Sequence, residues 1–177
     1  MNARRITRIA VMAALTFIGS LIRIPIGPIP ITLQTVFVIL AALLLQPADA
    51  ALAMGVHFVL MLFMKGSAIF VSPSTGFLFG FILAAFLGSL IAHRTAFGKT
   101  TAGMAVAVLV TAASCYVIGL PYMYYVLDVL KGADMNLMAI LEAGLIPFIP
   151  GDLIKAGIAF VVGKVAVPHV EPLLREA

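Results

Sequence analysis

The sequence predicts an all-α integral membrane protein built as a bundle of six transmembrane helices. Of its 177 residues, 63% are hydrophobic and 10% are charged, whereas soluble domains contain about 25% charged residues. The apolar runs lack the alternation of a membrane β-barrel strand, because they are apolar on every face. At roughly 20 residues per span, the chain is long enough for about six helices in a single membrane domain, residues 1–177.

Six apolar segments, separated by charges, prolines or glycines, give the expected spans. We place them at residues 6–22, 32–45, 50–64, 74–92, 100–120 and 150–167. The first resembles a signal peptide, but no small-x-small cleavage site follows it, so we expect a retained span. Because proline interrupts helices, we expect Pro121 to end the fifth span and Pro168 to lie beyond the end of the sixth.

The connection after the first span is too rich in proline for a helix and too apolar for an ordinary loop. Residues 25–30 contain three prolines and one glycine. Non-helical backbone at membrane depth is tolerated only where it is buried in protein or lines a cavity. We therefore expect this loop to fold over an outward-facing cavity as a lid, with polar groups beneath it from Thr32, Gln34 and Thr35.

The start of the sixth span carries two opposite charges in a chain with few charges inside its apolar segments. Pro150 suits a first helical turn, and Asp152 lies where the helix dipole favours a carboxylate. Lys155, three residues on, shares its face. Ionisable residues at membrane depth usually face a bundle interior or a cavity. The pair is either a structural ion pair or a solute site.

Small residues spaced by four mark two helices for close packing. Ala10 and Ala14 form such a patch on the first span, which packs either within this protein or against a partner membrane protein. The fourth span carries a longer series of small residues spaced by four, which predicts a tightly packed central helix. These residues are Gly76, Gly80, Ala84, Gly88 and Ala92. His57, alone in the third span, is a minor candidate, since an isolated histidine in an apolar span is usually a packed core residue.

The distribution of lysine and arginine predicts the orientation. With six spans, seven basic residues lie on one side: Arg4, Arg5, Arg8, Arg94, Lys99, Lys164 and Arg175. Three lie on the other: Arg23, Lys65 and Lys131. The positive-inside rule then places both termini in the cytoplasm of a prokaryotic cell and the lid on the outer side. This topology also explains the positive net charge, so the charge is no reason to expect a nucleic-acid partner.

Several classes of chemistry have no support in the sequence. A phosphate loop of the G-x-x-x-x-G-K-[ST] type, an H-E-x-x-H pair and a G-x-S-x-G elbow are all absent. One cysteine and three scattered histidines predict neither a disulfide nor a metal site. We expect no enzyme and no cofactor. The outer site suits a small, partly apolar organic anion, with Lys155 binding a carboxylate and Asp152 accepting from amide-like N–H groups.

Two motifs resemble those of a known family. The segments IPIGPIPITLQT, residues 24–35, and PFIPGDLIKA, residues 147–156, are similar to the first-loop and second signatures of BioY proteins, in the same order and spacing. BioY is the biotin-binding S component of energy-coupling factor (ECF) transporters. The resemblance implies a six-helix bundle that captures biotin outside, with a transmembrane scaffold and two ATPases driving uptake.

The same resemblance implies roles for individual residues. Asp152 and Lys155, with Gly151 beside them, would contact the ligand, the proline-rich loop would close over it, and the Ala10/Ala14 patch would dock on the scaffold. The family usually reads Gly-Pro-Thr-Gly-Gly-Tyr-Leu where this chain has SPSTGFL, residues 72–78. We therefore expect Phe77 to pack against the ligand without contributing a phenol, and Ser74 or Thr75 to supply a hydroxyl in its place.

Two alternatives remain at this point. A gradient-driven carrier would need a titrating carboxylate, which Asp152 provides. A structural membrane subunit would use Asp152 and Lys155 as an internal ion pair and bind no ligand. The sequence leaves open whether the energy module is dedicated or shared.

Overall fold

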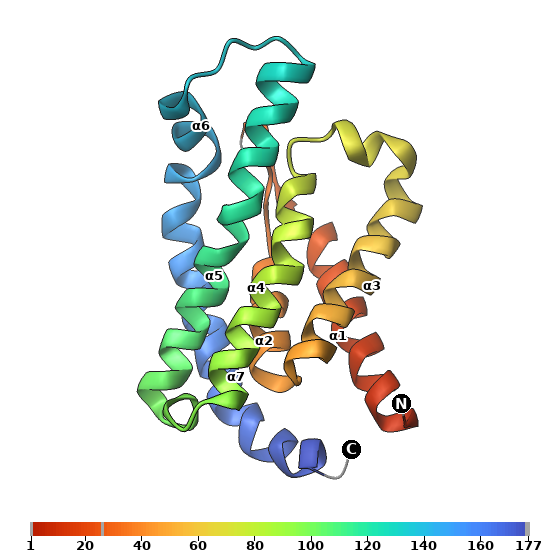
Figure 1. Cartoon of the computed structure of the whole chain (residues 1–177), viewed down its shortest axis with the longest axis vertical. Helices are drawn as coiled ribbons and strands as arrows, with labels where there is room; N and C mark the ends of the chain where they lie inside the picture. Colours follow the sequence, from red (N-terminus) through yellow and green to blue (C-terminus); the bar gives the residue numbers. More distant parts are fainter. Residues whose placement is uncertain (1, 26, 176–177) are drawn as a thin grey trace.

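The computed structural model is a bundle of helices that run side by side between two ends (Figure 1). It describes residues 2–25 and 27–175; Ile26 of the proline-rich loop lies outside this part, as do residues 1, 176 and 177. Both termini lie at the lower end in Figure 1, and α6 lies at the upper end. The side chain of Arg175, one of the seven basic residues counted above, is not described.

The helices and strands follow one another in this order: α1 (Ala3–Leu21), β1 (Arg23–Ile24), β2 (Ile31–Thr32), α2 (Gln34–Leu44), α3 (Pro47–Lys65), η1 (Gly66–Val71), α4 (Thr75–Arg94), η2 (Phe97–Lys99), α5 (Thr101–Tyr124), η3 (Tyr125–Leu130), α6 (Leu137–Gly144), η4 (Ile146–Phe148) and α7 (Ile149–Arg175). The segments η1, η2 and η4 are 3-10 turns, and η3 is a π-helical continuation of α5.

Helix α2 lies at the centre of the bundle and contacts α1, α3, α4, α5 and α7. All but two of its eleven residues are buried. Eleven residues rise about 16 Å, roughly half of the ~30 Å hydrocarbon thickness. The N-terminus of α2 therefore lies inside the bundle rather than at its surface, and this depth creates room for a site above it.

The proline-rich loop rises from that point as a short antiparallel ribbon. Arg23 pairs with Thr32, and Ile24 pairs with Ile31. Gly27, at the turn, has a φ of 61°, which favours glycine. The loop is therefore not helical, and its base is anchored where the backbone N–H of Leu33 donates to Gly19 O at 3.2 Å.

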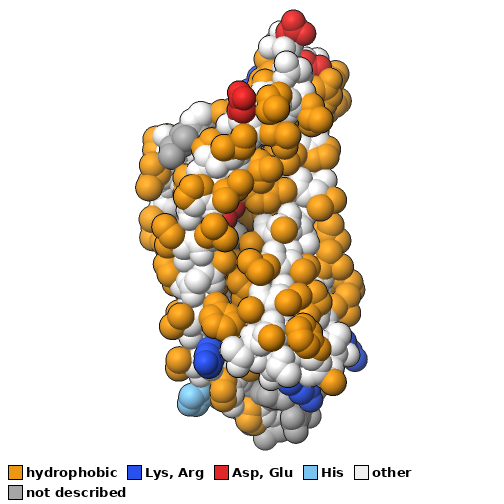
Figure 2. Space-filling view, turned by 90° about the vertical axis from the view of Figure 1, so that its left-hand side faces the viewer, with side chains coloured by type: hydrophobic (Ala, Val, Ile, Leu, Met, Phe, Trp, Pro, Cys, Tyr) orange, Lys and Arg blue, Asp and Glu red, His pale blue; other side chains and the backbone are white. Residues whose placement is uncertain are grey.

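Four helical segments of the described chain are long and apolar enough to cross a membrane: Pro47–Val71, Thr75–Arg94, Thr101–Leu130 and Leu137–Val170. The two other expected spans fall short for different reasons. Helix α1 has 19 residues but begins with three arginines, and α2 has 11 residues. Figure 2 shows a broad apolar surface between acidic side chains at one end and basic side chains at the other.

Helices α4 and α5 pack with almost no space between them. A Cβ on Gly80 would overlap the carbonyl of Cys115, and one on Gly88 would overlap the hydroxyl of Thr111. In the opposite direction, a Cβ on Gly119 of α5 would overlap the ring of Phe77. The small residues of α4 thus let α5 pack directly against it, and Gly119 of α5 leaves the space that the Phe77 ring of α4 occupies.

Two predicted helix ends were wrong, and proline is the reason in both. Helix α5 continues through Pro121, because Met123 beyond it is fully buried against α6. Helix α7 continues through Pro168 to Arg175, with His169 Nδ1 2.9 Å from Val165 O. Near its end α7 turns sideways (Figure 1). A proline inside a membrane helix can bend it without ending it, because the residues on either side keep their contacts with the rest of the bundle.

Candidate functional site

The predicted charge pair lies in the first turns of α7, where Pro150 occupies the first turn. Lys155 Nζ lies 2.5 Å from Asp152 Oδ1, and the two side chains are 7% and 14% exposed. The other carboxylate oxygen of Asp152 accepts a short hydrogen bond from the hydroxyl of Tyr116 on α5. Lys155 Nζ also donates to the backbone carbonyl of Thr32 at 3.4 Å. The pair is thus tied both to α5 and to the base of the loop.

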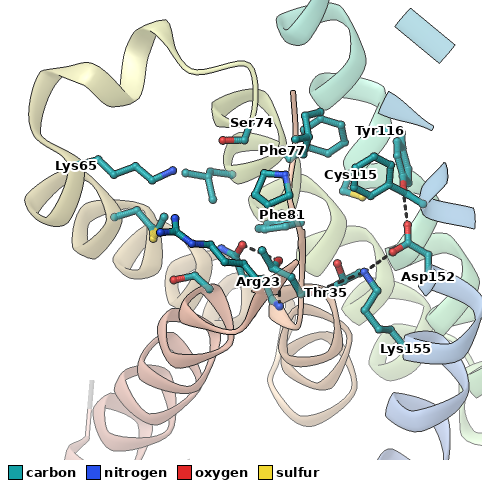
Figure 3. Close-up of a pocket in the computed structure, with 18 of the residues that line it drawn as sticks. Arg23, Thr35, Lys65, Ser74, Phe77, Phe81, Cys115, Tyr116, Asp152 and Lys155 are labelled. Atoms are coloured by element: carbon teal, nitrogen blue, oxygen red, sulfur yellow. Dashed lines mark hydrogen bonds and ion pairs between the residues drawn. The ribbon is translucent and has the colours of Figure 1, made fainter. Parts of the chain in front are cut away.

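These groups line a cavity between the loop, α3, α4, α5 and α7 (Figure 3). Within the described part of the chain, its wall contains six of the eight predicted ligand contacts: Thr32, Gln34, Ser74, Phe77, Asp152 and Lys155. Gly151 and Thr75 are not part of the wall. The loop itself contributes Ile29 and Pro30, so it forms one side of the cavity.

Gly151 and Thr75 support the site from behind. Thr75 is fully buried, and its hydroxyl donates to the carbonyl of Ile69, which holds the connection between α3 and α4 in place. A Cβ on Gly151 would lie 3.9 Å from the side chain of Ile31. This is an ordinary van der Waals distance, so α7 packs beside the loop here with room for a small side chain.

A chain of hydrogen bonds organises the polar wall at the start of α2. The hydroxyl of Thr32 donates to Gln34 Oε1 at 2.9 Å, and Gln34 Nε2 lies 2.8 Å from Nε2 of His57. His57 is fully buried in α3. It is therefore a packed core residue that orients the Gln34 amide, rather than part of the cavity wall.

The aromatic wall of the cavity comes from α4 and α5. The rings of Phe77 and Tyr116 meet edge to face, with centroids 5.5 Å apart, and Phe81 adds a further apolar surface. Phe77 lies against Gly119, which leaves room for its ring. Because Tyr116 carries the phenol that Phe77 lacks, the cavity retains one aromatic hydroxyl.

Among the cavity residues that sequence reasoning did not assign to the site are an aromatic hydroxyl and two cations: Tyr116, Arg23 and Lys65. Tyr116 has no sequence signal, because a tyrosine in an apolar helix has many ordinary uses. Arg23 and Lys65 were interpreted as loop charges that report topology. Both nevertheless line the cavity and add two positive charges to its wall. Figure 3 shows Lys65 across the cavity from Asp152 and Lys155.

The predicted docking patch lies elsewhere, on the outside of α1. Ala10 and Ala14 are both exposed, and Val11 and Ile18 are exposed beside them. The opposite face of α1 buries Ile9, Met12, Ala13 and Thr16. Helix α1 therefore presents an apolar face with two small residues away from the bundle.

Comparison with known proteins gives consistent matches along the chain. The sequence profile described as the BioY family matches residues 1–172. The biotin transporter BioY of Thermotoga maritima is 32% identical, with 88% of this chain and 91% of that protein covered. The biotin transporter BioY of Rhodobacter capsulatus is 33% identical, with 91% and 92% covered. The crystal structure of the S-component for biotin from an ECF-type ABC transporter matches with a TM-score of 0.75, 26% identity and 92% of each chain covered.

Proposed function

The chain belongs to the BioY family, and we propose that it is the S component that captures biotin for an ECF-type transporter. The cavity of three cations and one carboxylate, with an aromatic wall, is the observation that carries this proposal. Biotin combines a ureido ring, an apolar sulfur-containing ring and a carboxylate on a flexible chain. Each of these parts has a complementary surface in the cavity.

We place the ureido ring at the α7 side of the cavity. Asp152 is the cavity's carboxylate and accepts from N–H groups, while Lys155 and Tyr116 already hold it in position. A second carboxylate placed here would be repelled by Asp152, although Lys155 compensates part of that charge. Phe77 and Phe81 provide the surface on which the apolar ring packs.

The carboxylate of biotin then lies toward Arg23 and Lys65. It does not lie at Lys155, as the sequence suggested, because Lys155 is paired with Asp152. Both cations line the cavity wall, and a carboxylate bound beside Arg23 and Lys65 would compensate their positive charge. A guanidinium pairs with a carboxylate through two parallel hydrogen bonds, while an ammonium acts as a point charge. Because Arg23 stands at the base of the proline-rich loop, this contact would also hold the loop closed as a lid.

We infer six membrane spans, with α1, α2, α3, α4, α5 and α7 crossing or entering the bilayer and both termini in the cytoplasm. The ribbon of the loop fills the half of the membrane that α2 leaves free. Since Arg23 and Lys65 line the cavity, the outer side has fewer loop charges than the sequence count suggested. The imbalance of positive charge toward the termini is correspondingly stronger.

The partners in this proposal are a transmembrane scaffold and a pair of ATPases. The exposed Ala10 and Ala14 support docking through α1, because small residues let helices approach closely in a membrane. In this arrangement the chain itself catalyses no reaction and carries no cofactor. Biotin is its ligand, and ATP hydrolysis by the partner supplies the energy for uptake.

Reconstitution in vesicles tests this function directly. Vesicles that contain the chain, the scaffold and the ATPases should accumulate labelled biotin when ATP is enclosed, and vesicles without the ATPases should not. Replacing Ala10 and Ala14 with leucine should abolish uptake while leaving biotin binding intact. Leucine at Ala113, an exposed alanine of α5, is the matched control and should transport normally. ATP-independent uptake driven by an ion gradient would contradict the proposal.

A further inference from the structure

We propose that the end of the bundle that carries the termini holds a binding site for the phosphate of an anionic phospholipid. The site is a cavity between the start of α1, the turn between α2 and α3, and the end of α4. Its charged residues are Arg5, Arg8, Arg94 and Asp49. It lies at the opposite end of the bundle from the ligand cavity, and the argument for it does not depend on which solute the protein captures.

The cavity's carboxylate is already fully engaged. Arg5 Nε donates to both oxygens of Asp49 at 2.8 and 2.9 Å, and Arg5 Nη2 donates at 2.5 Å. Among the described residues, this ion pair and the Asp152–Lys155 pair are the ones that the structure forms. The charges of Arg8 and Arg94 are therefore not neutralised by a carboxylate in the described part of the chain.

Arg8 provides the more specific sign that an acceptor belongs here. Its Nε donates to the backbone carbonyl of Arg4 at 3.3 Å. Its Nη1 is buried, however, and has no hydrogen-bond partner among the described residues. A buried N–H without an acceptor costs free energy, and the cost is greater for a charged group. An oxyanion in the cavity would satisfy it.

The location and the residue type both favour a phospholipid headgroup as the source of that oxyanion. Guanidinium groups match the geometry of phosphate oxygens and form paired hydrogen bonds with them. Arg8 lies in the first turns of α1 and Arg94 is the last residue of α4, so both stand where helices leave the apolar part of the bundle. Basic pockets between helices at this level bind anionic headgroups.

Thermal unfolding of the full chain in detergent, with added lipid, tests the proposal. Phosphatidylglycerol should raise the unfolding temperature saturably, and phosphatidylcholine should have far less effect. Arg8→Gln and Arg94→Gln should each raise the lipid concentration needed for half-maximal stabilisation by about fivefold. This is the effect expected for one basic residue near a charged headgroup. Arg8→Lys should have an intermediate effect, because it keeps the charge and loses the paired geometry.

Lys99→Gln is the matched control, since Lys99 lies at the same end in η2 outside this cavity. It should retain the wild-type response to phosphatidylglycerol. An equal loss in Lys99→Gln would overturn the proposal, because it would show a diffuse surface charge effect. An equal response to both lipids would also overturn it. If inorganic phosphate alone stabilised the protein saturably, and the same arginine variants lost this effect, the site would bind free phosphate. That result would overturn the proposal that a phospholipid occupies it.

Discussion

Two ion pairs in this protein have the same chemistry but different placement. Arg5 and Asp49 join α1 to α3, and the Arg5 side chain is 34% exposed. Asp152 and Lys155 lie on one helix, α7, and are both largely buried beside a cavity. The first pair holds two helices together. The second joins two residues of one helix, and its hydrogen bonds to Tyr116 and Thr32 connect α7 to α5 and to the loop. Because it also lines a cavity inside the bundle, we propose that it binds the ligand.

This comparison predicts that breaking the α7 pair has the largest effect. Lys155→Met leaves the Asp152 carboxylate buried without its cation, which typically destabilises a protein by about 3–5 kcal/mol. It should also weaken biotin binding at least ~100-fold, as for the loss of one partner of a buried charge pair. Thermal unfolding and equilibrium titration of the purified protein measure the two effects.

The double variant Asp152→Asn/Lys155→Met separates stability from binding. Replacing both partners removes the uncompensated charge, so most of the lost stability should return. Biotin binding should stay lost, because the acceptor for its N–H groups is gone. Recovery of both properties would mean that the pair is structural.

Removal of the Tyr116 hydroxyl should have the next largest effect. Tyr116→Phe keeps the edge-to-face contact with Phe77 but deletes the hydrogen bond to Asp152. Hydrogen bonds to charged groups contribute about 1.5–3 kcal/mol. Tyr116 acts on biotin only by positioning Asp152, so we expect biotin affinity to fall about tenfold, at the lower end of that range. Tyr122→Phe is the control, since the Tyr122 hydroxyl bonds to the carbonyl of Phe70 away from the pair.

Arg23→Gln and Lys65→Gln test where the carboxylate of biotin lies. Each should weaken biotin binding by about fivefold, in the range of a partly solvated charge contact. Neither should weaken binding of biotin methyl ester, which lacks the negative charge. If the ester and the acid respond equally, the carboxylate lies at another part of the cavity.

The smallest effect on binding is expected for the other ion pair. Arg5→Gln and Asp49→Asn should each lower the unfolding temperature far less than Lys155→Met does, because solvent screens the partly exposed Arg5. Biotin affinity should change less than twofold, because this pair lies at the opposite end of the bundle. A tenfold loss would show that the two ends are coupled.

The sequence predicted the site best where a residue type was out of place. Asp152 and Lys155 were identified because charge is costly at membrane depth, and the non-helical loop because three prolines within residues 25–30 exclude a helix. Tyr116 was missed because its role depends on how α5 packs against α7. Local pattern does not determine that packing.

The errors in the helix bounds have the same origin. Pro121 and Pro168 were assigned as helix ends from local propensity, but burial of Met123 and the contacts of neighbouring turns outweigh one missing N–H. The sequence did place Gln34 beneath the lid, but its apolar run gave no indication that α2 is only 11 residues long and begins deep within the bundle. That depth follows from the contacts of α2 with five other helices.

The central claim is that the buried pair of α7 is the biotin site, and Asp152→Asn tests it most directly. The substitution keeps the size of the side chain and removes the charge that we propose binds the ureido N–H groups. Titration of the folded wild-type protein with biotin should show saturable, stoichiometric binding, and the variant should bind at least ~100-fold more weakly. Unchanged binding in a folded Asp152→Asn protein, or no binding by the wild type, would contradict the account.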